Sequence, residues 1–151
     1  MAKKTKQKNR AEAQKHTIKT EGYSSDKEKV VWRFDMIDRS GKFAFNPNGD
    51  SFKCKDFLEK LIDYSSMTWA EVKNQTHDGG KTKNHFLSPQ SLSPEAAERL
   101  NAKQLEEYSD SIFSFALDNK LRLVGIRKNE DFHVLWYDPE HEVCPSKKKH
   151  T

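Results

Sequence analysis

Three short apolar runs separated by two polar turns lie between residues 111 and 137, and this pattern constrains the fold more than any other part of the chain. The runs cover residues 111–117, 121–127 and 131–137. Runs of this length that are rich in β-branched, leucine and aromatic residues and are bounded by turn residues are typical of β-strands. The sequence therefore predicts a three-stranded antiparallel meander, because each turn is too short for a crossover.

The residues before the meander predict an N-terminal β-hairpin and a helix. Residues 30–36 have alternating apolar positions, residues 38–41 have the composition of a turn, and residues 42–45 predict a second strand. An apolar stripe then predicts a helix that is capped by Asp50 or Ser51 and ends near Tyr64.

Two further helix starts carry capping signals. Thr68 and Glu71 have the spacing of a capping box, which predicts a short helix to about residue 75. Ser93 followed by Pro94 predicts another helix to about residue 104, since proline is favoured at the first helical position. The expected fold is α+β: an N-terminal β-hairpin, two to three helices, then a three-stranded antiparallel meander forming one sheet with helices on one face.

The positive charge of the chain is concentrated at its ends. The 151 residues include 27 basic and 23 acidic side chains, of which residues 1–20 hold seven bases and one acid and residues 147–149 hold three bases. The remaining 17 bases and 22 acids give the centre a charge of −5. The sequence predicts a basic disordered tail at 1–28, one domain at 29–145 and a basic tail at 146–151. Such tails bind polyanions through phosphate neutralisation or serve only to keep the chain soluble.

No apolar run in the sequence approaches the length that spans a bilayer, so no membrane association is expected. Cys54 and Cys144 have no metal-binding spacing and would make a poor disulfide framework, which favours a reducing cytoplasm. There is no phosphate-binding loop, dinucleotide fingerprint or nucleophile elbow, which leaves kinases, dehydrogenases and serine hydrolases without support.

The final hairpin offers the first group of candidate functional residues. With Asn129-Glu130 as a two-residue turn, Arg122 is expected opposite Tyr137 and on the same face as His133. A guanidinium clamps a phosphodiester, and an imidazole titrates near neutrality and can serve as acid or base. Arg and Tyr also occur on strand surfaces for packing and solubility alone, and both interpretations stay open.

The polar loop 76–85 is the second candidate site. It contains His77, Lys81, Lys83 and His85, which can place positive charge over a substrate backbone. Its length exceeds an ordinary connection of about four to six residues. An exposed connection between helices would account for the same residues. His141, which follows the last strand, is either a catalytic partner or a turn residue paired with a neighbouring glutamate.

The segments 120–127 (KLRLVGIR) and 132–141 (FHVLWYDPEH) resemble the end of small bacterial toxins of the RelE-like kind. The resemblance implies a compact metal-independent endoribonuclease with helices packed on an antiparallel sheet, no cofactor, RNA as substrate and a small acidic antitoxin-like partner. This chain is longer than a minimal toxin, and its centre is acidic where such toxins are basic throughout. The residues that match are Arg122, Arg127, His133 and His141, with loop contributions from Lys81, Lys83 and His85.

The mechanism that the resemblance implies is attack of a ribose 2′-hydroxyl on the adjacent phosphate, with a His or Lys as base, an Arg at the phosphorane and a second His as acid. The alternative is a non-enzymatic module that binds nucleic acid or protein. The two differ in one structural expectation: an enzyme brings at least two histidines to a cleft beside Arg122 or Arg127.

Overall fold

The fold was analysed in a computed structural model, and residues 25–145 are the part of the chain that the structure describes. The tails expected at 1–28 and 146–151 fall outside this range, apart from residues 25–28. The elements, in chain order and with η for a 3₁₀ helix, are η1 Ser25–Lys27, β1 Val31–Arg33, α2 Cys54–Ser65, α3 Trp69–Asn74, β2 His85–Phe86, η2 Pro89–Ser91, α4 Pro94–Ala102, η3 Glu106–Ser111, β3 Ile112–Ala116, β4 Arg122–Lys128 and β5 Asp131–Asp138.

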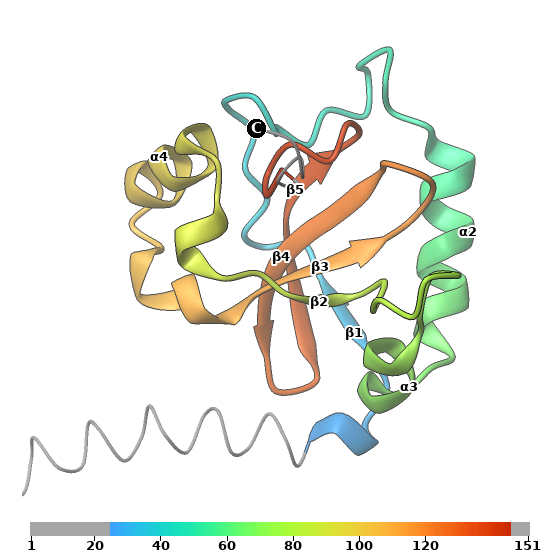
Figure 1. The fold of residues 1–151 in the computed structure, drawn as a ribbon. Coiled ribbons are helices and arrows are strands. Elements are labelled where there is room, and N and C mark those ends of the chain that lie inside the picture. The colour runs from blue at the N-terminus through green and yellow to red at the C-terminus, as the bar shows by residue number, and fades with distance from the viewer. Residues whose placement is uncertain (1–24, 146–151) are drawn as a thin grey trace, which may run out of the picture.

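The five strands form one mixed sheet in the order β1-β5-β4-β3-β2 (Figure 1). The strands β5, β4, β3 and β2 pair antiparallel, and β1 adds to β5 in the parallel direction. The predicted α+β class and the antiparallel meander are therefore confirmed. No helix within residues 25–145 has both the length and the apolar character that a membrane crossing requires.

Helices cover both faces of the sheet, so the expectation of helices on one face is wrong. Helices α2 and α3 lie on one side of the sheet and α4 lies on the other (Figure 1). The side chains of α2 and α3 share a core with Phe113 and Phe115, whereas those of α4 share a second core with Ile112 and Val124. Strand β3 reflects this arrangement, since four of its consecutive residues are buried. A strand whose two faces are both covered by helices buries side chains on both faces.

The N-terminal β-hairpin is absent, because only Val31–Arg33 forms a strand and residues 42–45 form none. The apolar alternation in this second segment has another origin. Phe43 packs in the core beneath α4, while Phe45 packs against the core on the opposite face of the sheet. The segment therefore wraps past the end of the sheet and is held there by hydrogen bonds to β5, including one from Tyr137 N to Phe43 O of 3.2 Å.

The capping box at Thr68 and the Ser93 cap of α4 are confirmed. The N-cap of helix α2, however, is Lys53 instead of Asp50 or Ser51, so the helix starts two or three residues later than the sequence predicts, and Lys53 caps it without a side-chain hydrogen bond. The Tyr137 hydroxyl fixes this start, since it accepts a hydrogen bond from Lys53 N (3.3 Å) and donates one to Ser51 O (3.2 Å). A side chain 84 residues away thus replaces the local cap.

A β-bulge in β5 changes the register expected for the final hairpin. The pairing is as expected next to the turn, where Ile126 lies opposite His133, but Gly125 pairs with Val134 and Val124 with Trp136. Leu135 is the extra residue, and both Leu135 and Trp136 face the α4 core. As a result Tyr137 lies on the opposite face from the one expected, and Arg122 pairs with Asp138 instead of Tyr137.

The bulge requires a residue without a Cβ at position 125, and this requirement can be tested. A Cβ at this position would lie 2.2 Å from the backbone oxygen of His133, which cannot swing away as a flexible side chain can. We expect Gly125→Ala to lower the free energy of unfolding by about 1–3 kcal/mol or more, as measured by urea denaturation. Gly79→Ala is the control, because a Cβ there meets nothing within 4 Å. Equal stability of the two variants would contradict the assigned register.

Buried Asp38 ties the wrapped segment to β5 and to α4. Its carboxylate accepts two hydrogen bonds from Arg99, of 2.9 and 2.8 Å, and one of 3.0 Å from Trp136 Nε1. Burial acts to raise the pKa of Asp38, but these bonds and one from Ser40 N outweigh it, so the pKa lies below its ordinary value of 3.8. A carboxyl whose pKa is lowered by folding stabilises the fold above its unfolded pKa, and this contribution is lost as the pH falls through the folded pKa.

Removal of the arginine should make this loss smaller. In Arg99→Gln, burial still raises the pKa of Asp38 while its main opposing hydrogen bonds are gone. We expect the decrease in the free energy of unfolding between pH 7 and pH 3, measured by urea denaturation, to be smaller than in the wild type, because the folded pKa of Asp38 is no longer held below its unfolded value. Lys42→Gln, which removes an exposed ion pair with Glu142, should leave that decrease unchanged. Identical profiles for the Arg99 variant and the wild type would contradict this account.

Candidate functional site

The polar loop after α3 is fixed to the sheet through buried Asn84. Its amide nitrogen donates to Val72 O (2.9 Å) and to Gln75 Oε1 (3.2 Å) at the end of α3. Its amide oxygen accepts from Ala116 N of β3 (2.9 Å) and from the Tyr64 hydroxyl of α2 (3.2 Å). Asn84 thus joins two helices and a strand, and the residues on either side of it in the chain take their places from it.

The loop itself is a compact turn. His77 N donates to Lys81 O, and Lys83 N donates to Gln75 O, so the chain folds back on itself beside Asn84. Gly80 lies at the turn with a φ of +83°, a conformation that glycine adopts without steric cost. Three of the four candidate residues in this segment, His77, Lys81 and Lys83, lie in the turn, and His85 is the first residue of β2 instead of a loop residue.

The strand pairing brings His85 near Arg122. His85 lies opposite Ser114 of β3, and Arg122 lies opposite Ala116 on the other side of that strand. Because alternate residues of a strand share a face, Ser114 and Ala116 place both partners on the α4 face of the sheet. His85 and Arg122 therefore flank β3 diagonally.

The turn 118–121 holds the Arg122 guanidinium. Its Nη1 donates to the carbonyl oxygens of Asp118 (3.1 Å), Asn119 (2.8 Å) and Leu121 (3.0 Å). Nε and Nη2 make no hydrogen bond with other residues in the described part of the chain. The guanidinium is thus fixed by one nitrogen while its other N–H groups remain available to a ligand.

His141 arrives from a second tight turn. It has a φ of 58°, and the buried Asp138 carboxylate holds the turn by accepting from Glu142 N and Val143 N, both at 2.9 Å. Burial lowers the pKa of His141, and the positive charges of Arg122 and His85 lower it further, while Asp138 opposes them. Arg122 and His85 thus lie close enough to His141 to act on its pKa.

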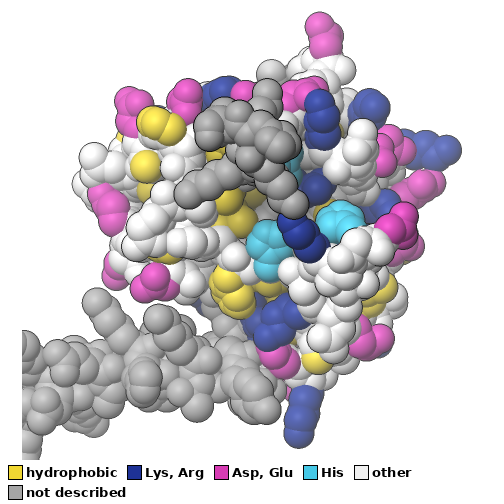
Figure 2. Space-filling model, in the orientation of Figure 1, with side chains coloured by type: hydrophobic (Ala, Val, Ile, Leu, Met, Phe, Trp, Pro, Cys, Tyr) yellow, Lys and Arg dark blue, Asp and Glu magenta, His cyan; other side chains and the backbone are white. Residues whose placement is uncertain are grey.

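These elements enclose a cleft of about 950 Å³. Six of the nine residues that the sequence singled out line it: His77, Lys81, Lys83, His85, Arg122 and His141. Lys120 is a fourth cation on its wall, and Glu140 is the one acidic side chain among the lining residues described. Figure 2 shows histidine side chains beside Lys and Arg near the middle of this face. Although the centre of the chain is acidic, the cleft is basic and carries three imidazoles.

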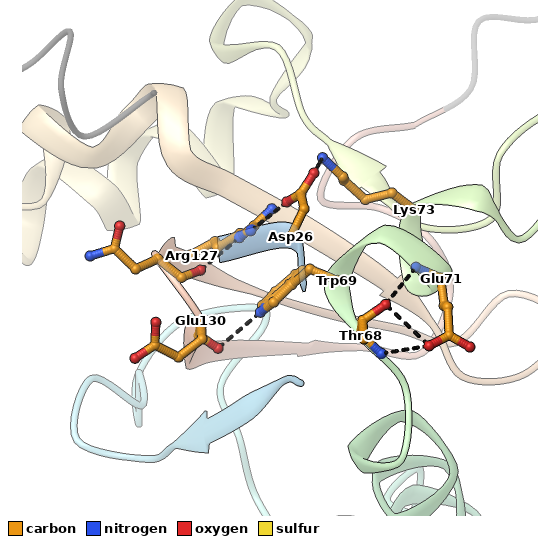
Figure 3. Close-up of polar contacts among 8 residues, drawn as sticks. Asp26, Thr68, Trp69, Glu71, Lys73, Arg127 and Glu130 are labelled. Atoms are coloured by element: carbon orange, nitrogen blue, oxygen red, sulfur yellow. Dashed lines mark hydrogen bonds and ion pairs between the residues drawn. The ribbon is translucent and has the colours of Figure 1, made fainter. Parts of the chain in front are cut away.

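The other three residues lie elsewhere. Arg127 is buried at the opposite end of β4, where it donates to Asp26 and Asn129 O and stacks 4.1 Å from the Trp69 ring (Figure 3). Asp26 also pairs with Lys73, and Trp69 donates to Glu130 O, so this cluster joins η1, α3 and the final hairpin (Figure 3). The arrangement gives Arg127 a structural role.

His133 and Tyr137 also have structural partners. His133 Nδ1 lies 2.6 Å from Asp35 Oδ1, and this contact lowers the pKa of Asp35. Tyr137 is buried against Phe45, Phe52 and Phe57 in addition to its contacts at the start of α2. Neither residue lines the cleft.

Sequence reasoning missed Lys120, Asn119 and Glu140 as cleft residues, and it missed the role of Asn84. The first three could have been found, because they flank Arg122 and His141 directly in the chain. Asn84 carries no such signal, since it stands between two polar residues in a segment without apolar positions.

Within residues 25–145 no cluster of three or more His, Cys, Asp or Glu side chains is arranged to hold a metal ion. The chain matches no protein-family model, no curated protein and no solved structure. The class of activity must therefore be argued from the cleft itself: a basic hollow with several imidazoles, suited to a phosphate-bearing ligand and to proton transfer.

The role of Asn84 can be tested apart from any activity. Asn84→Ala leaves Ala116 N without this partner and removes one of the two donors to Val72 O, which should cost about 1–3 kcal/mol for the unsatisfied group. We also expect faster hydrogen exchange of the amides at 76–83, because the loop loses its attachment. The control is Asn74→Ala on the exposed end of α3. Equal exchange in both variants would show that the loop is fixed by other contacts.

Proposed function

We propose that this protein is a metal-independent endoribonuclease of toxin type, acting in the cytoplasm, with the basic cleft as its active site. The observation that supports the proposal is the common location of His77, His85 and His141 beside Arg122. Cleavage through the 2′-hydroxyl needs a base, an acid and a cation at the phosphate, and this cleft contains all three kinds of group.

The reaction uses the RNA's own hydroxyl as nucleophile. One histidine removes the proton of the 2′-hydroxyl, whose oxygen forms a bond to the adjacent phosphorus. The bond from phosphorus to the 5′-oxygen breaks, and a second, protonated histidine gives its proton to that oxygen. The products are a 2′,3′-cyclic phosphate and a 5′-hydroxyl. Arg122, through Nε and Nη2, stabilises the negative charge that develops on the phosphate oxygens.

His141 is the better candidate for the base. Its lowered pKa keeps the imidazole neutral, and so able to accept a proton, at a pH where an ordinary histidine is partly protonated. His85, on the opposite side of Arg122, then serves as the acid, and His77 with Lys81, Lys83 and Lys120 binds neighbouring phosphates. Fixed cations of this kind contribute sequence-independent, salt-dependent affinity.

A second candidate function is binding of nucleic acid or protein without cleavage. The charge of the cleft favours it, since four cations attract a polyanion whether or not a proton moves. A small acidic protein would compete for the same cations, and such an antitoxin-like partner fits either function. The two candidate functions are therefore distinguished by whether RNA is cleaved, and not by how tightly it binds.

The activity test is incubation of RNA with the purified full chain in EDTA. We expect cleavage by the wild type and a loss of about 10²–10⁴-fold in His141→Ala and in His85→Ala, the range typical of removing a general acid or base. The matched control is His133→Gln, whose imidazole lies outside the cleft and which should retain activity near that of the wild type. RNA that stays intact with all proteins, yet binds in a salt-dependent manner, would favour the binding module.

The pH profile tests the assignment of the base. Because the pKa of His141 is lowered, the acid limb of kcat/KM should have its midpoint below the ordinary histidine value of 6.5. Arg122→Gln removes one positive charge that lowers this pKa, so the limb should move to higher pH as the rate falls. An acid limb that does not move in this variant would contradict the role of His141, whatever the size of the rate loss.

A further inference from the structure

A second hollow adjoins the cleft on the other side of the polar loop. It has a volume of about 560 Å³, within the range of about 300–1,000 Å³ that is usual for small-molecule sites. His77, Lys83 and Asn119 line both hollows, so these three residues form the wall between them. A ligand that enters the cleft can therefore extend across this wall into the second hollow.

The floor and rim of this hollow differ in chemistry. Its lining is more polar than apolar, and Met67, with the small exposed parts of Tyr64 and Leu117, supplies the apolar part. At its rim the side chains of Asp63, Lys60 and Asn119 make no hydrogen bond or ion pair with other residues in the described part of the chain. A hollow with a small apolar area and available polar groups at its rim suits a heterocyclic base, which contacts apolar side chains with its faces and is recognised by hydrogen bonds at its edge.

We propose that this second hollow is a nucleobase subsite that receives the base of the nucleotide next to the scissile phosphate, and that it selects guanine. This inference rests on the proposed ribonuclease function, because only a ribonuclease has a scissile phosphate. The phosphate stays in the cleft beside Lys83 and His77, and the base crosses the wall that those residues form.

Asp63 is the reason for guanine. A carboxylate accepts hydrogen bonds and donates none, so it favours an edge with adjacent donors. Guanine presents two neighbouring donors there, N1–H and the N2 amine, whereas adenine, cytosine and uracil each present a single donor group with an acceptor beside it. Asp63 would also repel a phosphate, which keeps the phosphate in the more basic cleft and sets the direction in which the nucleotide lies.

The test measures binding of the four nucleoside 5′-monophosphates to the full chain by NMR titration, which needs no catalysis. A bidentate contact discriminates by about 1–3 kcal/mol, so GMP should bind at least about fivefold more tightly than AMP, CMP or UMP. Shifts should be largest at Asp63, Met67 and Leu117. In Asp63→Asn the preference for GMP should disappear while binding of the other nucleotides stays within about twofold, since the amide offers one acceptor in place of two.

The matched control is Glu59→Gln, which removes a carboxylate of the same helix that does not line the hollow and should leave the preference for GMP intact. Equal binding of all four nucleotides, or a preference that survives in Asp63→Asn, would overturn the subsite. If the four nucleotides bind equally and RNA is cleaved next to every base alike, the guanine subsite is overturned but the proposed ribonuclease function is supported. Selective GMP binding without any RNA cleavage would support the subsite as a guanine site and overturn the proposed function.

Discussion

The buried amide of Asn84 is the interaction on which the site depends. Four hydrogen bonds reach from it to α2, α3 and β3, and all of its donors and its acceptor are used in an environment where an unpaired group would be costly. The amide sets the end of the loop next to β3, so that Lys83 and His85 emerge on either side of a fixed point. Without the Asn84 hydrogen bonds, the polar turn would not be attached to the sheet, and the cleft would lack one wall.

The parts of the fold that depend on local pattern were predictable. The meander, the Thr68 capping box and the Ser93-Pro94 helix start are each encoded within a few residues. The failures involve contacts that are distant in the sequence. Phe43 and Phe45 alternate as in a strand but serve two cores, and the helix expected at Asp50 or Ser51 starts later because Tyr137 determines the cap. The bulge at Leu135 is invisible in the pattern, since it shifts the register without breaking the apolar run.

The sequence indicated which kinds of residue form the candidate site better than it indicated which individual residues belong to it. The polar loop exceeds the usual length of a connection, and its His77, Lys81, Lys83 and His85 all line the cleft. The final hairpin misled for a physical reason: the bulge turns Tyr137 to the other face, while Arg127 and His133 are held by acidic partners, Asp26 and Asp35. The domain is acidic in sum, yet its cleft is basic, so the charge of the cleft could not be inferred from the net charge of the domain.

The central claim is that the cleft cleaves RNA by using the RNA's own 2′-hydroxyl, with histidines as acid and base. The most direct measurement is mass spectrometry of the ends produced when the full chain acts on a short RNA in EDTA, beside the same oligonucleotide with a single 2′-deoxy nucleotide at the cleaved position. The account predicts a 2′,3′-cyclic phosphate with a 5′-hydroxyl from the RNA and no cleavage at the 2′-deoxy position. A 5′-phosphate product, or cleavage at the deoxy position, would contradict it.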